Sequence, residues 1–119
     1  MTPRHILVVD DEPDIRSTVE AVLKKLGYAV VTAVSGDDGL KKWQVEKPDL
    51  VLMDIMMPGT PVKDIIPKMK GAKIVYLSVV RVSEAEKEDL MKSPNVKGFI
   101  QKPFDIDELA KQVKKFVGA

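Results

Sequence analysis

Short apolar runs alternate along the whole chain with longer segments whose apolar residues recur at helical spacing. The short runs are rich in Val, Ile and Leu and predict strands, because unbroken apolar runs of this length suit strands that are buried on both faces. They cover residues 5–10, 28–33, 50–54, 73–78 and 96–101. Because these five strands alternate with helices, the pattern predicts an α/β fold with a doubly wound parallel sheet.

The first two predicted helices have clear end signals. Residues 14–26 carry apolar side chains at the spacing of one helix face, and Gly27 follows where a helix end favours a left-handed residue. Ser35 is suited to cap a second helix that runs to about Glu46.

The remaining predicted helices differ in regularity. The proline-rich stretch after residue 58 allows only a short or distorted helix, because Pro67 would remove a hydrogen bond from a regular one. Residues 83–92 predict a polar helix with a weak apolar face. Asp105 is suited to cap the last helix, residues 106–117, whose apolar stripe begins at Ile106.

Composition narrows the class of protein. With 119 residues, 45% of them hydrophobic and 31% charged, the chain predicts one globular domain over residues 1–119. Apolar runs fall well short of the roughly 20 residues that span a bilayer, so we expect no membrane partner. The net charge of +1 argues against nucleic acid as a partner. The sequence has no cysteine, which excludes thiolate chemistry and fits a cytoplasmic protein.

Polar residues stand at the ends of the predicted strands. Asp10 and Asp11 end the first strand, Asp54 ends the third, Ser78 ends the fourth and Lys102 follows the fifth. Ligands of open α/β sheets bind beyond the carboxyl ends of the strands, so these side chains are expected to meet at one edge.

This set of side chains suits phosphoryl transfer. Carboxylates that lie close together repel one another unless a cation compensates, and Mg²⁺ prefers such oxygen ligands together with phosphate oxygens. A lysine and a hydroxyl can bind the phosphoryl oxygens. A serine, histidine and acid triad cannot be built, because His5 is the only histidine.

Each residue alone has a structural explanation. Asp10 and Asp11 can end a strand and begin a helix, Lys102 can be a solvated side chain, and Phe99 can belong to the core. Their coincidence at successive strand ends favours the functional interpretation.

The combined motifs resemble those of response-regulator receiver domains, the family of the chemotaxis response regulator. The matching segments are residues 8–12 (VVDDE), residues 54–59 (DIMMPG), Ser78 and residues 102–104 (KPF). The resemblance covers the whole chain and implies a flavodoxin-like sheet with strand order 2-1-3-4-5.

The resemblance also implies a role for the acidic residues. Asp54 would accept a phosphoryl group from a histidine kinase, a histidine phosphotransfer protein or a small phosphodonor. Asp11 and Asp54 would bind Mg²⁺ (or Mn²⁺) directly, with the backbone carbonyl of Met56. Asp10 would act mainly through a bound water.

Other positions match the switch of the family. Lys102 would pair with the phosphoryl oxygens, and Ser78 would move to hydrogen-bond the phosphorylated aspartate. Phe99 matches the aromatic residue that swings inward when that hydroxyl moves. The Lys102–Pro103 peptide bond would be cis.

Several positions depart from the family pattern. Val79 stands where receivers usually carry a small residue, and it is expected to restrict access to the phosphoryl group. Met56 and Val80 occupy positions that tune autodephosphorylation, and neither can orient water, which predicts a long-lived phosphoryl-aspartate. Residues 61–64 and 93–95 replace the usual loop sequences.

Three functions remain open from the sequence. The first is a phosphorylation-operated switch, not a turnover enzyme, that binds a downstream protein through its fourth helix, fifth strand and fifth helix, as a monomer or a phosphorylation-dependent dimer. The second is an interaction module that is not phosphorylated, which Val79 would favour. The third is a Mg²⁺-dependent phosphohydrolase, although such enzymes commonly carry a second Asp where Met56 stands.

Overall fold

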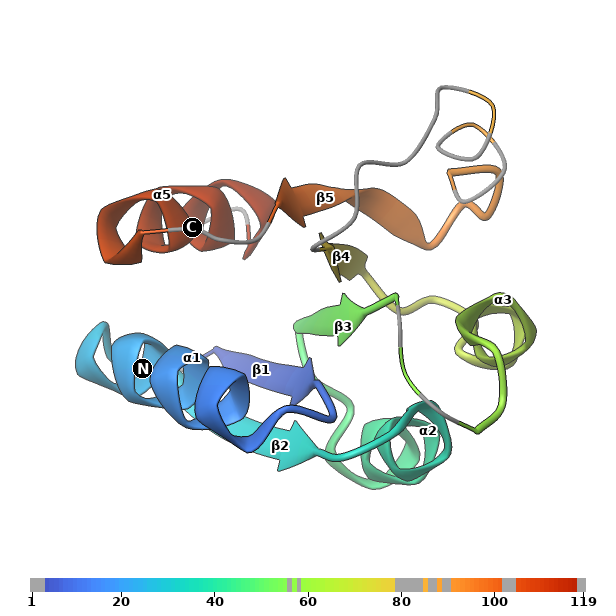
Figure 1. Cartoon of the computed structure of the whole chain (residues 1–119), viewed down its shortest axis with the longest axis horizontal. Helices are drawn as coiled ribbons and strands as arrows, with labels where there is room; N and C mark the ends of the chain where they lie inside the picture. The colour runs from blue at the N-terminus through green and yellow to red at the C-terminus, as the bar shows by residue number, and fades with distance from the viewer. Residues whose placement is uncertain are drawn as a thin grey trace.

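The computed structural model describes residues 4–55, 57, 59–78, 85, 88, 91–101 and 105–117. Its strands are β1 (His5–Val9), β2 (Ala29–Ala33), β3 (Leu50–Asp54), β4 (Ile74–Ser78) and β5 (Val96–Gln101). They form one parallel sheet in the order β2-β1-β3-β4-β5 (Figure 1). The predicted fold class and strand order are therefore confirmed, with strand ends shifted by one residue at most.

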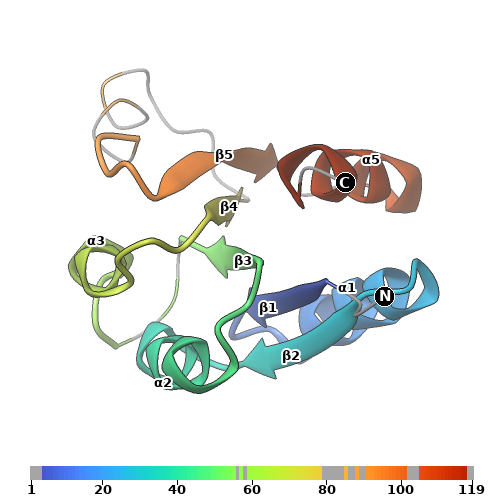
Figure 2. The ribbon, with the colours of Figure 1, turned by 180° about the vertical axis from the view of Figure 1, so that it is seen from behind.

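The helices cover both faces of the sheet. They are α1 (Pro13–Lys25), α2 (Gly36–Glu46), α3 (Val62–Ile65), the 3₁₀ helix η1 (Ile66–Lys68) and α5 (Ile106–Val117). Helices α1 and α5 lie on one side and α2 and α3 on the other, as both views show (Figures 1 and 2). Most of the helix predicted at residues 83–92 lies outside the described residues, but Ala85 and Glu88 are helical.

Two hydrophobic clusters separate along the strands because successive side chains point to opposite faces. Leu7 and Val9 join the cluster beneath α2 and α3. Ile6 and Val8 join the cluster that packs against α1 and α5. Both faces of β1 are thus buried, which explains its unbroken apolar sequence. Within the described residues, none of the helices is both long and apolar enough to cross a membrane.

The residues that the sequence predicts to cap or end helices have these roles in the structure. Gly27 adopts a left-handed conformation after α1, with φ of +98°. The Ser35 hydroxyl accepts a hydrogen bond of 3.1 Å from the backbone N–H of Asp38 and caps α2. Asp105 accepts one of 2.7 Å from the N–H of Glu108 at the start of α5.

The third helical segment is short and distorted, as Pro67 predicts. Four residues of α-helix pass directly into the 3₁₀ helix that contains Pro67. Its last carbonyls accept local backbone hydrogen bonds and also bonds from a distant segment: the side-chain amide of Asn95 donates to the carbonyls of Ile66 (3.0 Å) and Met69 (2.8 Å). Asn95 thus adds a second hydrogen bond to each carbonyl and ties this helix end to the segment before β5.

The predicted apolar stripe of the last helix needs one correction. Ile106 is 60% exposed, whereas Leu109, Val113 and Val117 are buried. At about 100° per residue, Ile106 lies only about 20° from the centre of the face that these three residues form, so its exposure comes from its place as the first residue of α5 and not from its direction. The buried stripe therefore begins at Leu109.

Candidate metal and phosphoryl site

The pairing of β1 with β3 brings two aspartates to one edge of the sheet. Val9 lies opposite Met53 in the parallel ladder, and each is followed by an aspartate. Asp10 is fully buried and Asp54 is 2% exposed. Both carboxylates are therefore held by the strands themselves rather than by a long loop.

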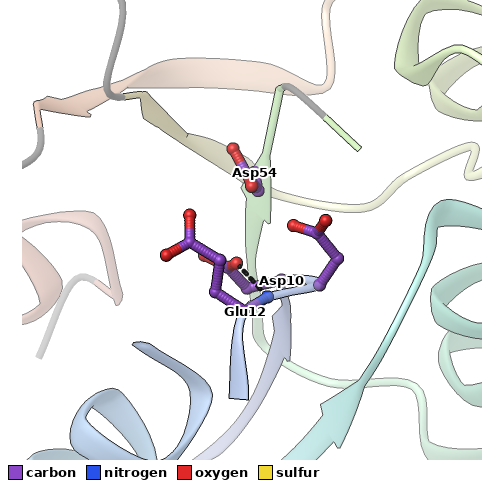
Figure 3. Close-up of side chains that lie close together, drawn as sticks. Asp10, Glu12 and Asp54 are labelled. Carbon is purple, nitrogen blue, oxygen red and sulfur yellow. Dashed lines mark hydrogen bonds between the residues drawn. The ribbon is translucent and has the colours of Figure 1, made fainter. Parts of the chain in front are cut away.

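Four carboxylates gather at this edge. Carboxylate oxygens of Asp10, Asp11, Glu12 and Asp54 all lie within 4.8 Å of one another. Asp10 and Glu12 come from the end of β1 and the turn after it, and Asp54 comes from the end of β3 (Figure 3). Asp10 and Asp54 are buried, whereas Asp11 and Glu12 reach solvent.

The donor set fits a hard divalent cation. All four groups offer oxygen, the ligand that Mg²⁺, Mn²⁺ and Ca²⁺ prefer. Negative charges held this close repel one another, and a bound cation offsets that repulsion. Because Asp11 and Glu12 reach solvent, the cluster is accessible from that side. The cluster can thus hold a metal ion next to Asp54.

Asp10 is anchored through its backbone and its side chain. Its N–H donates to the carbonyl of Ala33 at 3.1 Å, which ties the end of β1 to β2. Its Oδ1 accepts from the N–H of Glu12 at 3.0 Å, forming the local turn that aspartate favours (Figure 3). Its carbonyl accepts from Nη1 of Arg16 at 2.8 Å. The turn between β1 and α1 is therefore fixed before any ligand binds.

The aromatic position predicted to act in the switch lies on the neighbouring strands. Phe99 on β5 is partly buried, and its ring centroid is 5.4 Å from that of Tyr76 on β4, with the ring planes tilted by 42°. Tyr76 is 1% exposed, and burial raises the pKa of its hydroxyl to about 12. The Tyr76 ring is therefore a neutral, fixed surface against which Phe99 packs.

The described residues include part of the predicted site. It brings Asp10, Asp11 and Asp54 together. Ser78 is the last residue of β4 and pairs with Gln101 of β5. The remaining predicted site residues lie outside the described residues; they are Met56, Val79, Val80, Lys102 and Pro103.

Two residues at the site were missed by the sequence interpretation. Glu12 was part of the matching segment of residues 8–12 but was given no role, yet its carboxylate joins the cluster. Three consecutive acidic residues at a strand end were an available signal for it. Arg16 was not singled out, since a lone arginine on a helix is usually a solvated residue.

The chain matches the response regulator receiver domain family over residues 6–114. It is 33% identical to sporulation initiation phosphotransferase F of Bacillus subtilis, over 98% of this chain and 96% of that protein. It is 32% identical to the alkaline phosphatase synthesis transcriptional regulatory protein PhoP of the same organism, over 93% of this chain. The chain spans only about half of PhoP, 47% of its length.

Solved structures agree with the fold and the family. The chemotaxis response regulator CheY4 of Vibrio cholerae superimposes with a TM-score of 0.84 at 29% identity, covering 97% of this chain and 99% of CheY4. A CheY-like receiver domain protein from Methanospirillum hungatei gives a TM-score of 0.82 at 29% identity, covering 96% and 94% of the two chains. With its fold, its acidic strand ends and these relatives, the chain belongs to the family of response regulator receiver domains.

Proposed function

We propose that this receiver domain is a phosphorylation-operated switch in which Asp54 accepts a phosphoryl group from a histidine kinase or a histidine phosphotransfer protein. The observation that carries the proposal is the position of Asp54. It ends a central strand, is nearly buried, and shares a cluster within 4.8 Å with three further acidic residues. A surface carboxylate without such neighbours would offer no reason to favour phosphoryl transfer.

A divalent cation, Mg²⁺ or Mn²⁺, would be the cofactor. Asp11, Asp54 and the backbone carbonyl of Met56 would hold it directly, and Asp10 would hold it through water. When bound, the cation neutralises negative charge on the phosphoryl oxygens and so lowers the barrier to attack on phosphorus by the Asp54 carboxylate. The all-oxygen donor set of the acidic cluster supports this assignment.

The chemical step would be a phosphoryl transfer between two side chains. A carboxylate oxygen of Asp54 attacks phosphorus, and a P–O bond forms while the P–N bond to the donor imidazole breaks. The departing imidazole nitrogen takes a proton from solvent. Lys102 would pair with the transferred oxygens and Ser78 would hydrogen-bond one of them. Water later cleaves the acyl phosphate and regenerates the carboxylate.

The output would be a change of surface. Phosphorylation adds about two negative charges at Asp54. Movement of Ser78 would let Phe99 change its packing against Tyr76, which would alter the surface formed by the 83–92 segment, β5 and α5. A downstream protein would read that surface, in a cytoplasmic setting and with or without dimerisation of the receiver.

The test is direct phosphorylation. The protein is incubated with MgCl₂ and acetyl phosphate, and intact mass is measured against time. A gain of one phosphoryl group that requires Mg²⁺ and disappears in Asp54→Asn is the expected result. Asp64→Asn, which removes an exposed carboxylate from α3, is the matched control and should label like the wild type. Labelling that persists in Asp54→Asn, or absent labelling despite Mg²⁺ binding, would overturn the proposal and favour a non-phosphorylated interaction module.

A further inference from the structure

The guanidinium of Arg16 contacts the backbone of the acidic turn. Arg16 lies near the start of α1 and is partly buried, and its Nη1 donates a 2.8 Å hydrogen bond to the carbonyl of Asp10. That carbonyl shares one planar peptide unit with the N–H of Asp11. A bond to the carbonyl therefore sets the orientation of the peptide plane from which the Asp11 side chain departs.

The same turn is held at two other points. The N–H of Asp10 bonds to Ala33 on β2, and the carboxylate of Asp10 accepts from the N–H of Glu12. The backbone of Arg16 also forms the first turn of the helix, since its N–H donates to the carbonyl of Glu12 at 3.0 Å. Arg16 is thus attached to both ends of the segment that carries three of the four acidic residues.

We infer that Arg16 is a positioning residue for the divalent cation: it holds Asp10 and Asp11 in a cation-binding arrangement although their carboxylates repel one another. This inference rests on the proposed function. A segment held in place before binding loses less conformational freedom when the cation arrives, which raises affinity. Groups that orient metal ligands without touching the metal have this effect in other metal sites.

The direction of the effect separates positioning from simple electrostatics. Arg16 is positively charged and lies beside a cation site, so its charge alone disfavours the cation. If charge dominated, removal of Arg16 would tighten binding. If positioning dominates, removal weakens binding. We expect positioning to prevail. The affinity for the cation should then fall about tenfold, the smaller of the effects that follow loss of a residue that orients a metal ligand.

The experiment measures binding of the metal itself. Mn²⁺ is titrated into the cation-free protein at constant pH and ionic strength, and free Mn²⁺ is followed by electron paramagnetic resonance, with Mg²⁺ as competitor. Arg16→Met removes the charge and the donor while keeping a long, helix-compatible side chain. Lys24→Met is the matched control, because Lys24 is an exposed cation on the same helix that pairs only on the surface with Glu20. Circular dichroism checks that each variant is folded during the titration.

Arg16→Met is expected to bind Mn²⁺ about tenfold more weakly, Lys24→Met within about twofold of the wild type, and Arg16→Lys between the two. Equal or tighter binding by Arg16→Met would overturn the inference. If that variant does not fold, Arg16→Gln decides in its place: weaker binding supports the inference, and unchanged or tighter binding overturns it. If the wild-type protein binds no Mn²⁺, both the metal site and the inference about Arg16 are overturned. If the wild type binds Mn²⁺ and substitution of Arg16 leaves the affinity unchanged, only the inference about Arg16 is overturned.

Discussion

The ring of Phe116 lies so close to the backbone of Gly98 that a Cβ atom at position 98 would stand 2.6 Å from Cζ of Phe116. Gly98 is in β5 and Phe116 is in α5, so this contact fixes the distance between the last strand and the last helix. That strand and helix form part of the proposed output surface.

We expect Gly98→Ala to destabilise the protein. Overpacking costs about 1–3 kcal/mol, and reduced chain entropy in the unfolded state offsets about 0.4–1 kcal/mol of it. The net loss in free energy of unfolding should be about 1 kcal/mol, measured by urea denaturation. Phe116→Leu should relieve the clash, so the double variant should be more stable than the sum of the single effects predicts. Strict additivity would show that the close contact is unimportant.

Asn95→Ala should destabilise the irregular third helix. The side-chain amide of Asn95 donates to the carbonyls of Ile66 and Met69, and its loss removes both hydrogen bonds, although each carbonyl keeps one backbone donor. We expect a decrease of about 2 kcal/mol in the free energy of unfolding, about 1 kcal/mol for each lost bond. The control is Gln112→Ala, which removes an exposed hydrogen bond from the side-chain amide of Gln112 to the carboxylate of Glu108. This variant should change the free energy of unfolding by less than about 0.5 kcal/mol. A similar small change in both variants would contradict the role assigned to Asn95.

Asp38 should make stability depend on pH in the acid range. The N–H of Val34 donates to its carboxylate at 3.0 Å and, with the ammonium of Lys42 at 3.3 Å, holds its pKa below the ordinary value of 3.8 despite some desolvation. A depressed folded pKa adds stability above the unfolded pKa, and this stability is lost as pH falls through the folded pKa. Asp38→Asn should therefore be less stable than wild type at pH 7, and the difference should shrink below about pH 4. A difference independent of pH would contradict the assignment.

The phosphorylated form is expected to be long-lived, because three positions that tune the phosphoryl group in the family carry apolar residues here. By the family resemblance, Val79 would be larger than the usual residue, and Met56 and Val80 would be unable to orient an attacking water. Val79→Ala should speed both phosphorylation by acetyl phosphate and loss of the phosphoryl group, followed by intact mass. Unchanged rates would rule out restricted access as the cause, and a lifetime of seconds in the wild type would contradict the prediction itself.

Features encoded by neighbouring residues could be predicted from the sequence. Ser35 and Asp105 cap the helices that follow them, and Gly27 ends the first helix, because each acts within a few residues of its own position. The strand order and the meeting of Asp10 with Asp54 followed from the parallel α/β pattern and its family resemblance.

Features that depend on distant contacts could not be predicted. Asn95 satisfies a carbonyl that lies 26 residues earlier, and nothing in its local sequence specifies that partner. The contact of Arg16 with Asp10 depends on the shape of one turn, which residue types alone do not determine. The exposure of Ile106 depends on how far the core extends beneath the first turn of α5, and apolar spacing cannot show this because Ile106 shares the face of Leu109, Val113 and Val117.

The register of β1 against β3 has a consequence for how proteins of this design can diverge. Because Val9 lies opposite Met53, the backbone ladder brings the two aspartates that follow them to the same edge of the sheet. Exposed helix faces can therefore accumulate substitutions that change partner choice while the acidic pair stays in place. A single-residue insertion within either strand would have the opposite effect, since it would turn every later side chain to the other face of the sheet and separate the acidic pair.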